Sequence, residues 1–167
     1  MKAASKNTYV HVRWMIQRDM SEVLDIEADG FEHPWLEDDF RNCLKQRNAI
    51  GMVAECEDRV AGFMVYELER SCLRIVNFAV GVEYRRKRVG AQMIFKLMNK
   101  LSSQRRSKIT CEVGERNLQG QLFFRAMGFE AIAVLPEFYE ATGEDAYAFR
   151  FRYNPDVTEA LRAKYGG

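Results

Sequence analysis

The chain has 167 residues, of which 47% are hydrophobic and 12% aromatic, and its formal net charge is +1 at pH 7. This composition argues against wholesale disorder and predicts one domain over residues 1–167, with a core at about 10–153 and terminal tails at 1–9 and 154–167. The small net charge argues against a protein that binds nucleic acid or another polyanion through bulk charge, so any anion site must be local.

Neither a targeting signal nor a metal-ligand cluster stands out in the sequence. Residues 1–8 contain no apolar segment typical of a signal peptide and no glycine for myristoylation, and no apolar run approaches the ~20 residues that span a bilayer. The chain has two histidines and four widely spaced cysteines, Cys43, Cys56, Cys72 and Cys111. We therefore predict no metal site and expect a soluble, cytoplasmic protein with reduced thiols and no membrane partner.

The first half of the chain predicts one strand, two helices and then three more strands. Asp19 and Glu22 have the spacing of a capping box for the first helix, and the second helix has an amphipathic pattern. A polar turn between two apolar runs predicts a hairpin. The expected strands are 10–17, 51–56, 60–68 and 73–80, and the expected helices run from Met20 to Ala28 and from Leu36 to Leu44.

The segment that follows the fourth strand combines positive charge with a helix start. The strand ends at Val80, four cations follow at 85–88, and Gly90 opens a helix. Backbone N–H groups at a helix N-terminus are free to bind anions, and glycine lets a phosphate approach the backbone. The segment therefore predicts a local anion site, although the same pattern is also compatible with a solvated basic loop before an ordinary helix.

The second half of the chain predicts a helix, a strand, another helix and two final strands. Apolar residues recur at helical spacing after Gly90, with a helix end expected near Gln104. Asn117 is a suitable N-cap, and Gly128 is a suitable C′ residue for the next helix. The remaining expected strands are 108–113, 129–135 and 146–153. Together the elements predict an α/β (α+β) fold with a mixed, mostly antiparallel sheet of about seven strands and helices on both faces.

With these elements in place, the sequence from about residue 12 to 152 resembles the GNAT superfamily of acyl-CoA-dependent N-acetyltransferases. The segment from Arg85 to Gly90 is similar to the phosphate signature of that family. Within the family the chain looks most like the ribosomal-protein alanine N-acetyltransferases. That closer likeness rests on Pro34-Trp35 with Phe40, Phe78-Ala79-Val80, Glu112-Val113 with Asn117, and Met127-Gly128-Phe129 followed by Phe138-Tyr139.

The resemblance implies a donor site for acetyl-CoA. The backbone of the helix start would hold the pyrophosphate, and the Val80 N–H would face the thioester oxygen. The chain departs from the family at Arg88, which replaces a glycine; arginine disfavours positive φ, so we expect an ordinary φ or a slightly different turn. The expected cofactor-binding residues are Phe78, Ala79, Val80, Arg85, Arg86, Lys87, Arg88, Val89, Gly90, Ala91, Asn117 and Phe124.

Two residues are the expected catalytic groups. Glu112 lies in a strand in which alternate residues are apolar, so its side chain should point away from Ile109, Cys111 and Val113. Partial desolvation would make this carboxylate a better general base, whereas an exposed strand glutamate is the plain alternative. The branch places a tyrosine acid where this chain has Phe124. Tyr139 is the expected substitute, and its alternative role is a structural aromatic at the rim of the acceptor site.

Three functions remain compatible with the sequence. The favoured one is acetylation of the N-terminal α-amino group of a protein, such as a ribosomal protein, by direct attack in a ternary complex. The second is acetylation of a lysine side chain or a small-molecule amine. The third is a non-catalytic acyl-CoA-binding module, which the absence of tyrosine at Phe124 would fit.

Overall fold

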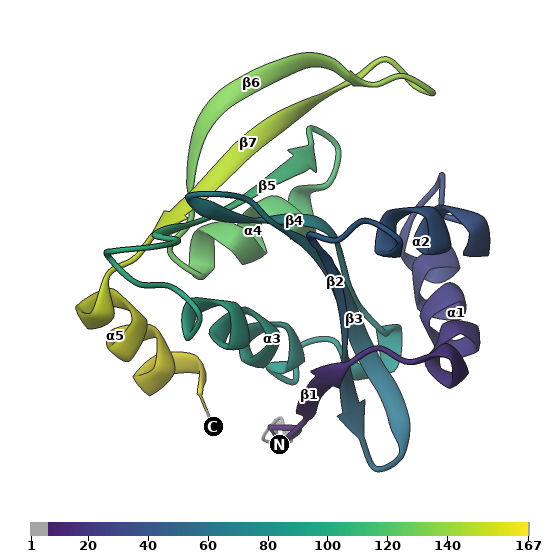
Figure 1. Cartoon of the computed structure of the whole chain (residues 1–167), viewed down its shortest axis with the longest axis horizontal. Helices are drawn as coiled ribbons and strands as arrows, with labels where there is room; N and C mark the ends of the chain where they lie inside the picture. Colours follow the sequence, from purple (N-terminus) through teal and green to yellow (C-terminus); the bar gives the residue numbers. More distant parts are fainter. Residues whose placement is uncertain (1–6, 167) are drawn as a thin grey trace, which may run out of the picture.

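The computed structural model describes residues 7–166, in which one seven-stranded sheet is flanked by helices (Figure 1). The strand order is β1-β2-β3-β4-β5-β7-β6; β4 and β5 pair in parallel, and the other neighbours pair antiparallel. This confirms the predicted fold class. The elements are β1 (His11–Trp14), α1 (Met20–Gly30), α2 (Glu37–Leu44), β2 (Ala49–Cys56), β3 (Arg59–Leu68), β4 (Cys72–Val80), α3 (Val89–Met98), β5 (Lys108–Gly114), α4 (Leu118–Ala126), β6 (Glu130–Tyr139), β7 (Glu144–Arg152) and α5 (Pro155–Tyr165).

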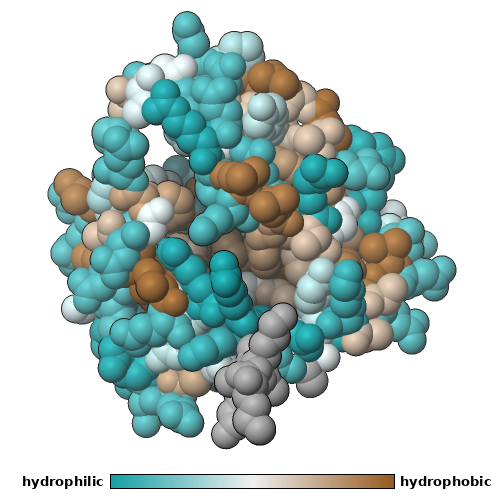
Figure 2. All heavy atoms as spheres, turned by 180° about the vertical axis from the view of Figure 1, so that it is seen from behind, coloured by the Kyte–Doolittle hydropathy of each residue, from teal (hydrophilic) through white to brown (hydrophobic). Residues whose placement is uncertain are grey.

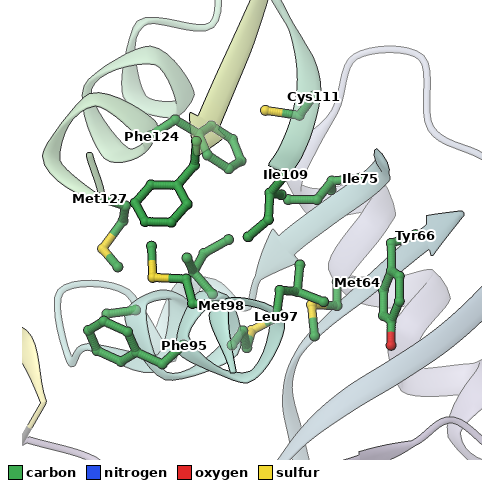
Figure 3. Close-up of a cluster of buried hydrophobic side chains, with 14 of the residues drawn as sticks. Met64, Tyr66, Ile75, Phe95, Leu97, Met98, Ile109, Cys111, Phe124 and Met127 are labelled. Carbon is green, nitrogen blue, oxygen red and sulfur yellow. The ribbon is translucent and has the colours of Figure 1, made fainter. Parts of the chain in front are cut away.

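The helices divide between the two faces of the sheet, and each face has its own core. In Figure 1, α1 and α2 lie on one side, and α3, α4 and α5 lie on the other. The larger cluster joins α3 and α4 to the sheet, with side chains such as Leu97, Ile109 and Phe124 pointing into it (Figure 3). The smaller cluster joins α1 and α2 to the opposite face around Val23, Phe40 and Phe63. Burial of these apolar side chains is the main force that holds both helix layers on the sheet.

The parallel pair at the centre of the sheet separates part-way along its length. β4 and β5 pair over Cys72–Ile75 and Lys108–Cys111, yet both strands continue beyond these residues. A register shift in the pairing of β3 with β4 leaves Val76 without a partner at this point. Such a bulge bends and twists its strand. The last residues of β4 therefore leave β5, and a gap opens between the two strands.

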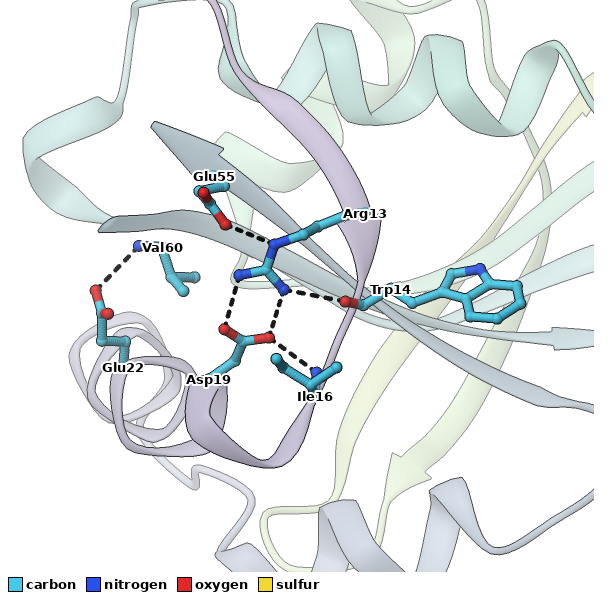
Figure 4. Close-up of polar contacts among 7 residues, drawn as sticks. All are labelled: Arg13, Trp14, Ile16, Asp19, Glu22, Glu55 and Val60. Atoms are coloured by element: carbon cyan, nitrogen blue, oxygen red, sulfur yellow. Dashed lines mark hydrogen bonds and ion pairs between the residues drawn. The ribbon is translucent and has the colours of Figure 1, made fainter. Parts of the chain in front are cut away.

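The N-terminal turn is held by the ion pair of Asp19 with Arg13 and by a hydrogen bond from β3 to Glu22, rather than by the predicted capping box. Asp19 accepts two hydrogen bonds from the Arg13 guanidinium, at 2.8 and 2.9 Å, and one from the Ile16 N–H at 2.8 Å (Figure 4). Glu22 accepts from the N–H of Val60 on β3 at 3.0 Å. The capping-box prediction is wrong because both carboxylates have stronger partners elsewhere in the fold.

Two further predictions for helices are wrong. α3 ends at Met98 rather than near Gln104, because a tight turn follows in which Leu101 still places its side chain in the core. Residues 154–167 were expected to be a tail, but 155–165 form the helix α5, with the Asn154 side chain accepting from the Val157 N–H. α5 packs against α3, and its Leu161 contacts the larger core cluster.

The surface is mostly polar on the face opposite to that of Figure 1. Figure 2 shows hydrophobic side chains there in small separate groups and in a hollow near the middle of that face. Within residues 7–166, no helix is long and apolar enough to cross a membrane.

Candidate active site

The gap between β4 and β5 exposes backbone groups of β4 that no strand pairs. The N–H of Gly81 donates to the carbonyl of Ala61 on β3 at 2.7 Å. Since consecutive N–H groups of a strand point to opposite edges, the N–H of Val80 points into the gap. The Val80 N–H is therefore free of β5 and oriented as the sequence-based prediction of a contact with a substrate oxygen requires.

The predicted anion loop lies directly after this strand. The four cations at 85–88 are all exposed, and Val89 begins α3. Arg86 and Arg88 have φ angles of 61° and 65°, so both lie in the left-handed region. Of the two alternatives expected for Arg88, the ordinary φ is therefore wrong: arginine adopts the conformation that favours glycine, at some conformational cost. The resulting curved loop and helix start fit a pyrophosphate group.

Gly90 is required by packing as well as by the anion site. A Cβ atom at this position would lie 3.1 Å from two ring carbons of Phe123, on α4. Glycine therefore allows the start of α3 to approach α4 closely, whereas the sequence suggested only the approach of a phosphate. The neighbours of Gly90 in α3, Val89 and Ala91, are buried in the larger core cluster.

Arg85 turns away from the other three cations. Its Nε donates to the carbonyl of Val80 at 3.3 Å, and a Cβ added at Gly30 on α1 would lie 3.8 Å from its Nη2. The guanidinium therefore lies at the edge of the gap, on the side of α1. Its predicted contact with the cofactor stays a prediction.

Glu112 lies on the sheet face covered by α1 and α2. Ile109, Cys111 and Val113 are buried in the larger cluster on the other face, as the alternation predicted. Glu112 follows the last residue of β5 that pairs with β4, so its carboxylate is next to the point where the gap begins. Its side chain is 19% exposed, which leaves it accessible from this face.

Arg74 on β4 is an ion-pair partner of Glu112 that the sequence did not reveal. The Arg74 Nε donates to the Glu112 Oε1 at 3.1 Å, and its Nη1 lies 3.7 Å from the Glu67 Oε2. The guanidinium stabilises the ionised carboxylate. The sequence predicted a partly desolvated carboxylate, and the structure adds an ion-pair partner that orients it. The one available signal was an arginine between buried apolar residues in the strand 73–80.

Asn117 is the N-cap of α4 and Phe124 lies within that helix, which is on the opposite face of the sheet from Glu112. The Asn117 Oδ1 accepts from the N–H of Gly120 at 2.9 Å, which confirms the predicted N-cap. A Cβ at position 120 would lie 2.7 Å from the Asn117 Nδ2, which explains the glycine inside this helix. Phe124 is 6% exposed, and its ring packs against Phe78 with centroids 5.8 Å apart.

Aromatic rings fill the space between the end of β4 and α4. Phe123 stacks on Phe78 at 5.5 Å and meets Phe124 edge to face at 5.2 Å. Phe124 also contacts Phe129 at 5.1 Å (Figure 3 shows Phe124 pointing into the core). The wall of the gap on this side is therefore apolar, and Phe124 offers no proton donor.

Tyr139 is the last residue of β6 and is half-buried. A Cβ at Gly114, the last residue of β5, would lie 3.4 Å from its ring. Burial, with smaller contributions from the Glu144 and Glu112 carboxylates, raises the pKa of its phenol. The structure thus brings Glu112 and Tyr139 to the same end of β5, while the anion loop lies at the end of β4.

The fold and these residues agree with comparisons to known proteins. The sequence model of the Acetyltransferase (GNAT) family matches residues 19–129. The chain belongs to the GNAT acetyltransferase family. It is therefore an N-acetyltransferase that takes its acetyl group from acetyl-CoA, as the sequence predicted.

Individual relatives of this GNAT chain include bacterial and plant proteins. A Bacillus subtilis (strain 168) protein named as a candidate ribosomal protein bS18-alanine N-acetyltransferase is 26% identical over 140 residues, which cover 83% of this chain and 93% of that protein. The crystal structure of the ribosomal-protein-S18-alanine N-acetyltransferase from Escherichia coli matches with a TM-score of 0.76 and 18% identity, covering 87% of this chain and 94% of that one. The structure of Arabidopsis thaliana NAA60 in complex with acetyl-CoA matches with a TM-score of 0.74 and 15% identity, covering 86% and 99%.

Proposed function

We propose that this acetyltransferase modifies the N-terminal α-amino group of a protein by direct attack in a ternary complex. The observation that carries the proposal is the position of Glu112. Its oriented carboxylate lies where β4 and β5 separate, on the face opposite to Phe78 and Phe124. An acceptor amine can thus reach the gap from the side of α1 and α2, while the donor lies against α3 and α4.

Acetyl-CoA would be held at the start of α3 and along the gap. The backbone from Arg86 to Ala91 would bind the pyrophosphate, together with the exposed cations of the loop. The cosubstrate supplies an activated acyl group as a thioester. The N–H of Val80 would donate a hydrogen bond to the carbonyl oxygen as negative charge develops on it.

Glu112 would act as the general base. An α-amino group has a pKa of about 7.7–8.0, well below the ~10.4 of lysine, so one carboxylate can remove its proton directly or through a water. The free amine then forms the new amide bond as the bond from carbonyl carbon to sulfur breaks. Arg74 would orient the carboxylate through the hydrogen bond from its Nε.

Tyr139 would supply a proton to the thiolate leaving group in place of the family tyrosine, which is Phe124 here. An ordinary phenol is already protonated at neutral pH, and burial raises the pKa of Tyr139 further, so its hydroxyl is kept as a hydrogen-bond donor for the departing thiolate. A thiolate with a pKa of ~8.5 can also leave without help, at some loss of rate.

The relatives support a protein N-terminus as acceptor. Two of them carry names that specify N-acetylation at an alanine of a ribosomal protein. We extend this acceptor class to the present chain, which would then act in the cytoplasm. A cationic small molecule has less support, because four of the six carboxylates in the acidic segments 37–39 and 140–145 already accept hydrogen bonds. Glu37 accepts from the Arg41 guanidinium, and Asp39, Glu144 and Asp145 accept from the backbone N–H groups of Leu36, Arg116 and Glu137.

Release of free coenzyme A thiol with a matched set of acceptors tests the proposal. The set contains a peptide with a free N-terminal alanine, the same peptide with a blocked N-terminus and an internal lysine, and a polyamine. We expect turnover with the first peptide alone, and loss of that turnover in Glu112→Gln. Turnover with only the blocked peptide or the polyamine would favour the second function, and acetyl-CoA binding without turnover on every amine would favour a binding module.

A further inference from the structure

Glu27 on α1 is a buried carboxylate that the proposed chemistry does not use. It is 2% exposed, yet it forms no ion pair within residues 7–166. Its Oε1 accepts from the backbone N–H of Trp35 at 3.0 Å, and its Oε2 accepts from the side-chain amide of Asn77 at 3.0 Å. Burial raises the pKa of this carboxyl, while the two hydrogen bonds act in the opposite direction. A group that is this costly to bury is expected to have a structural purpose.

The two partners of Glu27 lie on the two structures that would border the path of the acceptor: the connector before α2 and the strand β4. Asn77 precedes Phe78, Ala79 and Val80, the residues of β4 that line the gap. Trp35 lies in the connector at residues 31–36, between α1 and α2, on the same sheet face as Glu112. Glu27 thus bridges the wall of the acceptor side to the strand that is expected to polarise the thioester.

Phe31 and Trp35 of the connector pack against the smaller core cluster, but its backbone has few bonds to other elements. Its ring contact is between Trp35 and Phe40, at 5.1 Å, and Phe40 in turn packs on Phe63 of β3 at 5.5 Å. Among the hydrogen bonds described for residues 32–35, the bond from the Trp35 N–H to Glu27 is the one that reaches another element. Loss of this bond would leave the backbone of residues 32–35 held only by side-chain packing and by the flanking helices.

We propose that Glu27 is a positioning residue for acceptor binding. By accepting from Trp35 and Asn77 at once, it fixes the connector at the distance from the end of β4 that a peptide acceptor requires. This inference rests on the proposed acetylation of protein N-termini. Glu27 does not touch the reacting atoms, so it acts on acceptor affinity more than on the chemical step.

The test compares three variants with a matched control. Glu27→Ala and Asn77→Ala remove the bridge from either end. Glu27→Gln keeps it, because the glutamine oxygen can accept from Trp35 while its amide donates to the oxygen of a rotated Asn77 side chain. Asp19→Ala is the control, because Asp19, the N-cap of α1, is also a buried carboxylate, at 3% exposed, and is bonded to Arg13 rather than to the connector.

Two readouts are combined. The first is the KM for the acceptor peptide against that for acetyl-CoA. The second is the fluorescence of Trp35 in a Trp14→Phe background, which is a mild change because Trp14 is 73% exposed. We expect Glu27→Ala and Asn77→Ala to raise the acceptor KM about tenfold with the acetyl-CoA KM unchanged. Glu27→Ala, which also removes the bond to the Trp35 N–H, should shift the Trp35 emission to the red. Glu27→Gln should restore both values, and Asp19→Ala should lower only the melting temperature.

An equal rise in acceptor KM in Asp19→Ala and Glu27→Ala would overturn the proposal, because general destabilisation would then explain the effect. Unchanged Trp35 emission in Glu27→Ala would overturn it as well. If the wild-type chain acetylated no peptide N-terminus, the proposed function would fail instead. The fluorescence readout would still report whether Glu27 holds the connector. Should Glu27→Ala not fold, Asn77→Ala, which leaves the bond to Trp35 in place, decides between the outcomes.

Discussion

The pair of Glu112 and Arg74 allows the catalytic role of the carboxylate to be separated from its structural one. In Glu112→Gln, the amide oxygen still accepts from the Arg74 Nε, so the hydrogen bond persists and the charge is lost. Arg74 also keeps Glu67 at 3.7 Å, which limits the damage. For a pair whose side chains are 19% and 29% exposed, we expect a loss of about 1 kcal/mol in the free energy of unfolding. In a chain of this size that corresponds to a fall of about 2–4 °C in melting temperature.

The catalytic effect of the same substitution should be much larger. Removal of a general base lowers turnover by about 10²–10⁴-fold, while acetyl-CoA binding should be unchanged. Arg74→Gln is the matched control, because it breaks the same ion pair and leaves the base in place. The assays are thermal unfolding and thiol release from pH 6 to 9 for both variants. If Glu112→Gln remained near wild-type activity across that range, or if Arg74→Gln lost as much turnover as Glu112→Gln, the assignment of Glu112 as the base would be wrong.

Three other substitutions test separate parts of the site. Gly90→Trp should abolish measurable binding of coenzyme A, since a bulky side chain meets Phe123 and displaces the helix start; unchanged affinity in a titration would count against the anion site. Tyr139→Phe should lower kcat with little change in acceptor KM, and Phe124→Tyr should raise kcat; a rise in KM alone for Tyr139→Phe would indicate a role at the rim instead. Glu27→Gln should raise the melting temperature at pH 8, because burial raises the folded-state pKa of Glu27. The stability that this carboxyl contributes is present below its unfolded pKa of ~4.3 and is lost as the pH rises through the folded pKa. The difference in melting temperature from wild type should therefore disappear toward pH 4, and a difference independent of pH would refute this reasoning.

Locally encoded features were predictable from the sequence, and features that depend on pairing between distant segments were not. The helix that starts at Asn117 and closes at Gly128 carries its own caps, so its bounds followed from the residues alone. The ion pair of Arg74 with Glu112 joins residues 38 positions apart and requires the register of β4 against β5, which no local pattern contains.

The C-terminal helix was missed for a different reason. Asn154 and Pro155 are favourable residues for the N-cap and the first turn, so a local signal was present. The helix has 11 residues, as many as α1, but the sequence did not show what it would pack against. In the fold, α3 provides the surface, with Arg162 over the ring of Phe95. At Arg88 a local preference was misleading. Arginine favours a negative φ, but the surrounding loop imposes a φ of 65°.

The side chain of Gln92 connects the beginning of the chain to the anion loop. Its Nε2 donates to the carbonyl of Thr8 at 2.6 Å and to that of Arg88 at 3.2 Å, and its Oε1 accepts from the N–H of Val10. The N–H of Thr8 in turn donates to the carbonyl of Lys87. Residues 8–10 therefore act as a strap across the loop that is expected to hold the pyrophosphate. Purification tags and shortened variants should accordingly preserve the chain from Thr8 onward, because an alteration at that point reaches the donor side through Gln92.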